Sequence, residues 1–256
     1  MNDTRRRIRS LALMGVLLLA TTGLAACGDD SAEDPDFDKA LLVADDLGPD
    51  FRIAADDEEE KDDDDSDPDW GCLLDFKDDA ADESEDGDDD DIEVELEAAV
   101  DPGAPGVFQV VVDVGNEDKA RKLVGELADR VDGCHSVDTQ DEDTRWQFDV
   151  DSDRVAWADG ADQQVNVAAA GKASFSGVDL PVSLSFTLVR MKDVVSMVMF
   201  FDMASDIDEA NRDVVGVVVD RLSAALDGDD QPEPAGVLED YPIGEEFNEL
   251  LGGADA

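Results

Sequence analysis

Three cysteines and one histidine have the side chains with the widest choice of chemistry in this sequence. Cys27 ends an apolar run in "TTGLAACGDD", Cys72 and Cys134 lie in the body of the chain, and His135 follows the last cysteine directly. A thiol serves as half of a disulfide, a metal ligand, a nucleophile or a point of covalent attachment. The segment around each cysteine decides between these roles.

The first 26 residues have the layout of an export signal. Four arginines between positions 5 and 9 precede the apolar run "LALMGVLLLA", and small residues follow it up to Ala26. The apolar run is too short for a permanent membrane-spanning helix, so residues 1–26 are expected to be a signal peptide that is removed during export. The arginines also fit a twin-arginine signal loosely, so both that route and the Sec route stay open.

The end of this signal resembles the N-terminus of secreted bacterial lipoproteins. A lipobox, which is a Leu, two small residues and a Cys, is matched by Leu24, Ala25, Ala26 and Cys27. The resemblance implies that Cys27 becomes the mature N-terminus with a diacylglycerol on its sulfur, and it allows an acyl chain such as palmitate on its amine. The protein would then be anchored by lipid to the extracytoplasmic face of the cell membrane, with residues 27–36 as an acidic tether. The alternative is ordinary signal cleavage, which would leave a secreted protein with an odd thiol.

Lipidation of Cys27 leaves an even pair of cysteines in an oxidising compartment. We expect Cys72 and Cys134 to form a disulfide, which stabilises a fold of this kind by about 4 kcal/mol in the chain-entropy model. The alternative is two separate buried thiols. A structural zinc site is disfavoured because two cysteines and one histidine need a borrowed carboxylate to complete four ligands.

The sequence gives little support to catalysis, so no catalytic residue and no cofactor are expected. A Ser-His-Asp or Cys-His arrangement needs an orientable histidine, whereas His135 adjoins a cysteine that is expected to be oxidised. Paired carboxylates are uninformative in so acidic a chain, and no phosphate-binding glycine-rich loop follows a strand. Core packing is the simpler explanation for the aromatic side chains that a sugar platform would need, which are Trp70, Trp146, Trp157 and Tyr241.

The segment "DESEDGDDDDIE" has the spacing of an EF-hand calcium loop, with Gly87 at the position of the sharp turn. The carboxylate, hydroxyl and backbone ligands would come from Asp82, Ser84, Asp86, Asp88 and Glu93. Asp89 takes the place of the usual apolar residue, and Glu93 lies in a predicted strand instead of a helix. Such a pattern arises by chance in acidic sequence, so weak, diffuse cation binding is expected here and no specific metal site.

The net charge of −50 restricts the partners of this protein. Such a surface repels nucleic acid and anionic lipid headgroups, so we expect no nucleic-acid partner and membrane contact through the N-terminal lipid alone. Removal of the arginine-rich residues 1–26 makes the charge more negative still. The remaining partner is an unknown ligand or protein of the cell envelope, and a salt-tolerant source would explain the excess of acid.

Residues 37–227 have the pattern of one α+β domain. Apolar residues at helical spacing predict helices over 37–47, 117–131 and 208–226, with Gly48 ending the first helix and Asn116 capping the second. Alternating apolar and polar residues predict an antiparallel sheet of about six or seven strands. These strands are expected at 51–54, 92–97, 108–114, 146–150, 165–169, 182–188 and 194–201.

Two details of this sheet follow from the pattern. In the hairpin over 92–114, Ile92 and Leu96 on one strand and Phe108 and Val110 on the other are expected to face the core. The strand "VVSMVMFF" is apolar on both faces and is expected in the interior of the sheet. The acid-rich segments 56–69 and 78–91 are expected to be disordered loops, and residues 228–256 an acidic C-terminal tail.

The order of these segments resembles a family of actinobacterial lipoproteins related to the extracellular sensor domain of the mycobacterial kinase PknH. The segments are "ALLVADDLGPDF", an acidic spacer before a Cys, "DKARKLVGELADRVDGC" and "VSLSFTLVRMKDVVSMVMF". The resemblance covers nearly all of residues 37–227. It implies an antiparallel sheet flanked by helices, a ligand-binding cleft and two disulfides, whereas this chain has the cysteines for only one.

These observations favour a non-catalytic ligand-binding or sensor-like domain of the actinobacterial envelope, held by lipid, with an unknown ligand. Two alternatives stay open. The first is a lipoprotein that carries a lipid or glycolipid in a hydrophobic cavity, and the second is a cryptic hydrolase of envelope polymers.

The lipid anchor is tested by Cys27→Ala. Loss of the thiol removes the acceptor of the diacylglycerol, so the protein should leave the membrane fraction for the medium or stay unprocessed. Cell fractionation followed by immunoblotting measures this, with Ser31→Ala in the tether as the control. Normal processing and unchanged membrane retention of Cys27→Ala would contradict the anchor.

Overall fold

The computed structural model describes residues 35–54, 72, 92–98, 105–141, 144–203 and 207–243. All of these residues belong to one compact unit, residues 34–256. The lipobox, Cys27 and the candidate calcium ligands from Asp82 to Asp88 lie outside the described residues. No helix in the described ranges is long and apolar enough to cross a membrane.

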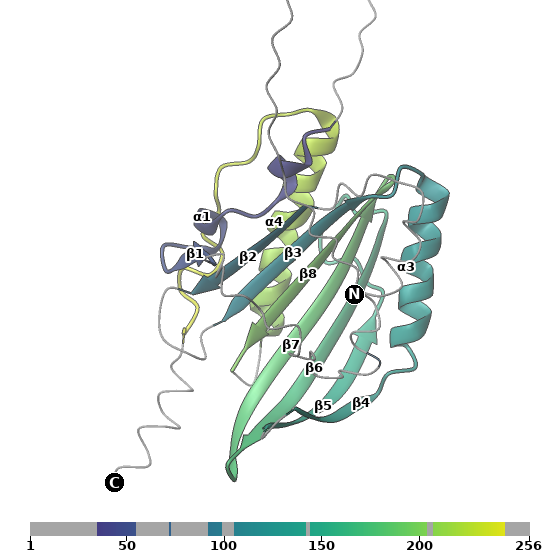
Figure 1. Cartoon of the computed structure of the whole chain (residues 1–256). Helices are drawn as coiled ribbons and strands as arrows, with labels where there is room; N and C mark the ends of the chain where they lie inside the picture. The colour runs from purple at the N-terminus through teal and green to yellow at the C-terminus, as the bar shows by residue number, and fades with distance from the viewer. Residues whose placement is uncertain are drawn as a thin grey trace, which may run out of the picture. The chain divides into compact units, whose positions relative to one another are not determined.

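One antiparallel sheet holds the eight strands found in the described residues, in the order β1-β2-β3-β8-β7-β6-β5-β4 (Figure 1). The strands are β1 Phe51–Ile53, β2 Ile92–Ala98, β3 Gly106–Asp113, β4 Ser136–Asp141, β5 Thr144–Asp153, β6 Gln163–Phe175, β7 Val178–Met191 and β8 Val194–Asp202. The predicted class, an α+β domain with an antiparallel sheet and flanking helices, is confirmed. The additional strand is β4, which escaped prediction because it lies at the sheet edge and Val137 is its one buried apolar residue.

The helical elements of the described chain are the 3-10 turn η1 Phe37–Ala40 and the helices α1 Ala44–Leu47, α3 Glu117–Val131 and α4 Asp208–Asp227. The predicted bounds of α3 are confirmed, and the side chain of Asn116 caps it by accepting a hydrogen bond of 3.0 Å from the Lys119 amide. The prediction of one continuous helix over 37–47 is wrong. Between η1 and α1 the backbone is extended, because the Leu42 amide donates to Gln109 Oε1 and the Val43 amide donates to Asp46 Oδ2.

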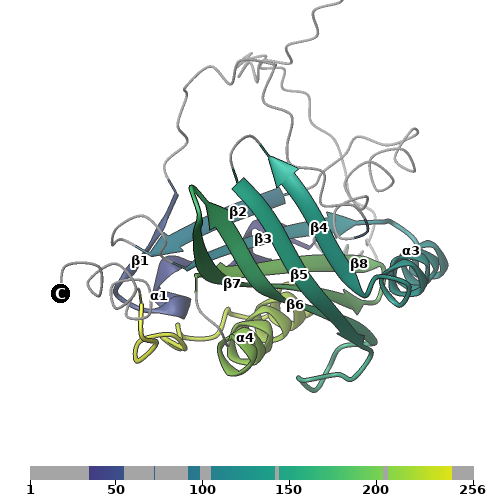
Figure 2. The same ribbon diagram turned by 90° about the horizontal axis from the view of Figure 1, so that it is seen from below.

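The two long helices cover opposite faces of the sheet (Figure 2). Side chains alternate along a strand, so on β7 Leu184 and Phe186 pack into the α3 cluster while Val189 packs into the α4 clusters. The α3 face is largely apolar. Buried polar side chains of the strands lie on the α4 face, Arg190 excepted, and they are Gln109, Gln164, Asn166, Ser183, Ser185, Thr187, Ser196 and Asp202.

The β2–β3 hairpin faces the core differently from the prediction. Leu96 pairs with Val107, and both are almost fully buried on the α4 face. Phe108 and Val110 therefore point to the α3 face, where they are half-buried. The prediction that both strands present these apolar residues to one core is wrong, because β3 carries apolar residues on both of its faces and the sequence does not say which set pairs with β2.

A buried ion pair fastens the N-terminal segment to α4. Arg221 Nε donates to Asp46 Oδ2 at 2.5 Å, and the two side chains are 6% and 1% exposed. Asp46 also accepts from the Val43 amide, and Arg221 also donates to the Lys39 carbonyl. The charges therefore have hydrogen-bond partners on both sides, as buried ions require.

The C-terminal segment packs onto the same region. The amides of Val237 and Leu238 donate to the carbonyls of Asp46 and Leu47 at 2.9 and 2.7 Å, and Leu238 is 2% exposed. The prediction that the chain from residue 228 onward is a loose tail is therefore wrong for its described part, which ends at residue 243. Two apolar pairs, Val237–Leu238 and Tyr241 with Ile243, were too isolated among acidic and proline residues to predict this packing.

Removal of one member of the ion pair tests its contribution to stability. Asp46→Ala leaves the Arg221 guanidinium buried without its carboxylate, so the free energy of unfolding should fall by about 3–5 kcal/mol. Asp45→Ala is the matched control, because Asp45 is exposed and its loss should change stability by less than about 0.5 kcal/mol. Urea unfolding followed by circular dichroism measures both. Equal effects would show that the pair does not hold the segment.

Candidate functional site

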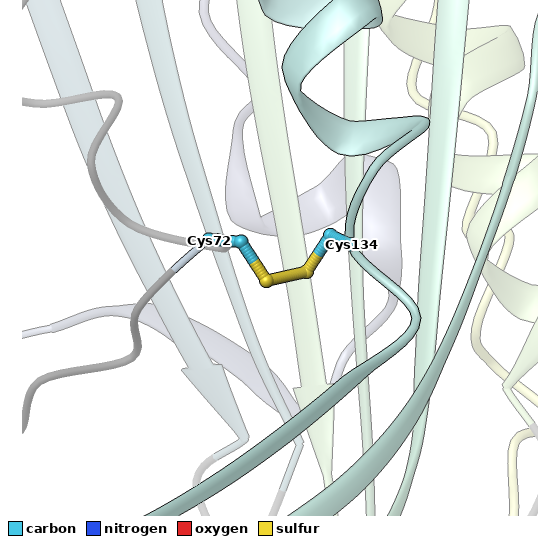
Figure 3. The surroundings of a disulfide bond; sticks show 2 residues. All are labelled: Cys72 and Cys134. Carbon is cyan, nitrogen blue, oxygen red and sulfur yellow. A yellow bond between two sulfur atoms is a disulfide. The ribbon is translucent and has the colours of Figure 1, made fainter.

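The cysteine pair has a structural role. Cys72 and Cys134 form a disulfide with a Cα–Cα distance of 5.7 Å (Figure 3). Cys134 follows the end of α3 and is 2% exposed, and both cysteines pack against the apolar cluster beneath that helix. The bond therefore fixes residue 72 against the end of α3, and its sulfurs are not thiols that act as nucleophiles or metal ligands.

The other residues that the sequence singled out are dispersed. His135 is exposed beside the disulfide, and within the described ranges no three His, Cys, Asp or Glu side chains lie together as metal ligands. Glu93 belongs to β2, as its predicted strand position required. Trp146 stacks on Phe148 at 6.3 Å, while Arg212 lies 5.2 Å over the ring of Trp157.

Tyr241 and Trp70 are the two remaining aromatic candidates. Tyr241 packs against Phe200 with a ring distance of 5.8 Å and donates from its hydroxyl to Asp202. Trp70 lies outside the described residues. The described aromatic side chains thus serve packing at separate places, as the simpler explanation required, and they do not form one sugar platform.

A hollow lies near the β4 edge of the sheet, across β4, β5 and β6. Its volume is about 540 Å³, and it opens on the face that α4 covers further along the sheet. Its lining is Ser136, Val137, Asp138, Gln147, Phe148, Asp149, Ala170, Gly171 and Lys172. We call this feature the hollow. Sequence reasoning missed it because its residues come from three strands, and only the strand register brings them together.

Ion pairs cross the strands at the hollow and fix its polar side chains. Asp138 accepts from Arg145 Nε and Nη2 at 2.8 and 2.6 Å and from Gln147 Nε2 at 3.3 Å. Lys172 donates to Asp179 at 2.5 Å, and Gln147 is its register partner on the neighbouring strand. Polar groups on rigid strands keep their geometry better than groups on loops do.

Ion pairs lower the pKa values of two carboxylates in this region. The hydrogen bond from Arg145 lowers the pKa of Asp138, and the hydrogen bonds from Lys172 and then Ser174 lower the pKa of Asp179. Both carboxylates are exposed, so these pairs contribute little to stability. Their small contribution exists above the unfolded-state pKa of aspartate and is lost as the pH falls through the lowered folded-state value.

The lining suits binding by hydrogen bonds. It combines the carboxylates of Asp138 and Asp149, the amide of Gln147, the ammonium of Lys172 and the hydroxyl of Ser136. No histidine, cysteine or tyrosine belongs to this lining. The arrangement can hold a polar ligand.

The floor of the hollow depends on a glycine. A Cβ atom on Gly171 would lie 1.9 Å from the carbonyl oxygen of Gln147 and 2.8 Å from the Cα of Phe148. Strand β5 therefore passes closer to β6 here than any side chain permits. Together with the small side chain of Ala170, this close approach shapes the floor of the hollow.

The opposite face carries a different feature, which we call the apolar row. It consists of half-buried side chains on β3 and β8, namely Phe108, Val110, Met197, Met199 and Phe201. Register pairs Phe108 with Met199 and Val110 with Met197, so the row is continuous across the two strands. Its chemistry suits apolar contacts.

Comparisons with known proteins add little to this geometry. No family model matches the sequence, and no curated protein matches it. The chain has a weak structural likeness to the extracellular domain of PknH from Mycobacterium tuberculosis, with a TM-score of 0.39 and 16% sequence identity. The match covers 52% of this chain and 63% of that chain, which is less than two thirds of its length. Membership of a lipoprotein family stays a prediction.

Two glycine-to-alanine substitutions with opposite expected effects on stability test the close approach of β5 and β6 at the floor of the hollow. Gly171→Ala should destabilise the protein by several kcal/mol, because its methyl group collides with backbone atoms of β5. Gly216→Ala in the middle of α4 meets nothing within 4 Å and should stabilise by about 0.5–1 kcal/mol. Thermal unfolding measures both. A tolerated methyl group at position 171 would show that β5 and β6 do not approach so closely.

Proposed function

We propose that this protein is a lipid-anchored extracytoplasmic domain that binds a small polar ligand without chemical conversion. The observation that carries the proposal is the hollow, an open depression across three strands whose lining contains both hydrogen-bond donors and acceptors. The ligand is supplied by the cell envelope or its surroundings, as befits an accessory or sensor-like role.

The location is supported by three features of the chain. Residues 1–26 have the layout of a signal peptide, and Cys27 ends a lipobox. The Cys72–Cys134 disulfide is a bond that persists in oxidising compartments. The net charge of −50 gives the domain no electrostatic affinity for an anionic membrane, so the lipid has to supply the attachment.

Binding is favoured over catalysis by the chemistry of the hollow. The carboxylate of Asp138 is held by a two-pronged bond from Arg145, which keeps it ionised and oriented. A general acid needs the opposite, a raised pKa. Lys172 forms an ion pair with Asp179. These groups are arranged to position a ligand.

The apolar row supports a second candidate function, that of a lipid or glycolipid carrier. Half-buried aromatic and methionine side chains form adaptable apolar surfaces. A carrier would hold an acyl chain against Phe108, Met199 and Phe201, on the face opposite to the hollow. The two candidates therefore differ both in the chemistry and in the location of the ligand.

Native mass spectrometry distinguishes the two functions. The protein is extracted from the membranes of its own cells under mild conditions, and any ligand that purifies with it is identified by mass. A small polar ligand that is lost from a Gln147→Ala, Lys172→Ala variant and retained by Met199→Ser would support the proposal. A lipid lost from Met199→Ser and retained by the hollow variant would contradict it and favour the carrier.

A further inference from the structure

The two edges of the sheet differ in length. The edge strand β1 has three residues, whereas β4 at the other edge has six, and no described strand lies beyond either of them. The sequence of β4, "SVDTQD", contains neither proline nor lysine, the residues that commonly prevent an edge strand from pairing. The β4 edge is therefore the better place for a further strand to add to this sheet.

The hydrogen bonds to β5 show which backbone groups of β4 point outward. The Val150 amide donates to the His135 carbonyl at 3.0 Å, and the register of β4 and β5 places these two residues opposite each other. In an antiparallel pair, residues bonded to the partner strand alternate with residues whose N–H and C=O groups point away from it. Val137 is therefore bonded to β5, whereas the amides and carbonyls of Ser136 and Asp138 point away from the sheet. These backbone groups have no partner among the described residues.

The side chains beside this edge determine which charge a partner should carry. Ser136, Asp138 and Asp149 are exposed and line the hollow next to the edge. Asp138 is paired with Arg145, but Asp149 is in no ion pair among the described residues. Ser136 lies opposite Asp149 and is small, so a long side chain on an added strand can pass over it. Because neighbouring strands lie about 4.8 Å apart, an extended lysine or arginine side chain reaches the Asp149 carboxylate.

A second copy of this chain is a poor partner for the same edge. Pairing of two β4 strands would bring acidic residues of both copies together, since the strand contains Asp138 and Asp141 and each chain has a net charge of −50. Like charges on neighbouring strands destabilise a sheet. The acidic residues therefore protect the edge from other copies of the chain, and they favour a basic partner.

We propose that β4 is a docking edge for an extended basic segment of another protein, which adds to the sheet as a strand next to β4. Its backbone would pair with Ser136 and Asp138, and one of its lysine or arginine side chains would reach over Ser136 to Asp149. In this mode of recognition, main-chain hydrogen bonds give affinity and the side chains beside the edge give specificity. The inference goes beyond the proposed function, because it assigns a protein partner to the edge and requires no small ligand in the hollow.

Hydrogen exchange at single amides tests the docking edge. The mature protein is labelled with ¹⁵N and mixed with a short capped peptide in which lysine alternates with threonine, without any small ligand. At a peptide concentration about ten times the dissociation constant, the amides of Ser136 and Asp138 should exchange about tenfold more slowly. The Val137 amide is the internal control, because it is already bonded to β5 and its exchange should change little.

Two further comparisons separate strand pairing from attraction by charge. A peptide of the same sequence with N-methylated backbone amides keeps its charges but has no N–H donors for the β4 carbonyls, so it should not slow the exchange. Asp149→Asn should weaken binding of the lysine peptide about two- to fivefold, as measured by calorimetry. Asp229→Asn is the matched control, because it removes the same charge from an exposed position beyond the end of α4 and should leave the affinity unchanged.

Several results would overturn the inference. One is that the lysine peptide does not bind, and another is that the N-methylated peptide binds equally well, which would show attraction by charge alone. Binding without slower exchange at Ser136 and Asp138 would place the peptide elsewhere on the acidic surface. Slow exchange at these amides without peptide, increasing with protein concentration, would show that a second copy occupies the edge. None of these results bears on a small ligand in the hollow, which native mass spectrometry tests separately.

Discussion

The pairing of β7 with β8 is the interaction on which the rest of this structure depends. These strands lie in the interior of the sheet, and their side chains are buried on both faces over most of their length. Each face then needs its own cover, which α3 provides on one side and α4 on the other (Figure 2). With a net charge of −50, the surface of this chain is dominated by acidic residues. Its apolar residues are therefore buried around these two central strands.

The two covers differ in chemistry, and this difference organises the molecule. The α3 face is packed by apolar contacts with the helix and by the disulfide at the end of the helix. The α4 face includes a layer of polar side chains, and the Asp46–Arg221 pair joins the N-terminal segment to α4 within it. Buried polar groups specify a unique arrangement when they are satisfied and carry a cost when they are not. Ser185 Oγ and Asn211 Oδ1 are buried in this layer without a hydrogen-bond partner among the described residues, so they carry such a cost.

Local signals in the sequence predicted the local elements well. The 3.6-residue period and the Asn116 cap predicted α3, and the alternation of apolar and polar residues predicted β7. The prediction of a continuous helix over 37–47 was wrong because the side chain of Gln109, far away in the sequence, accepts a hydrogen bond from the Leu42 amide. The prediction of which side chains of the β2–β3 hairpin face the core was wrong. Strand β3 is apolar on both sides, so the periodicity of its sequence does not decide its orientation.

The site depends on information that a single sequence does not contain. Asp138, Gln147 and Lys172 are ordinary exposed polar residues of three strands, and they converge only because the register of β4, β5 and β6 aligns them. The cysteine pair was predictable because cysteine number and compartment restrict the choices.

The proposed function assigns one face of the sheet to stability and the other to a polar ligand. A crystal structure of the protein purified from its own membranes tests this division most directly. We expect electron density for a small polar molecule on the α4 face, in contact with Gln147 and Lys172. An acyl chain along Phe108 and Met199, with ordered water alone in the hollow, would contradict it.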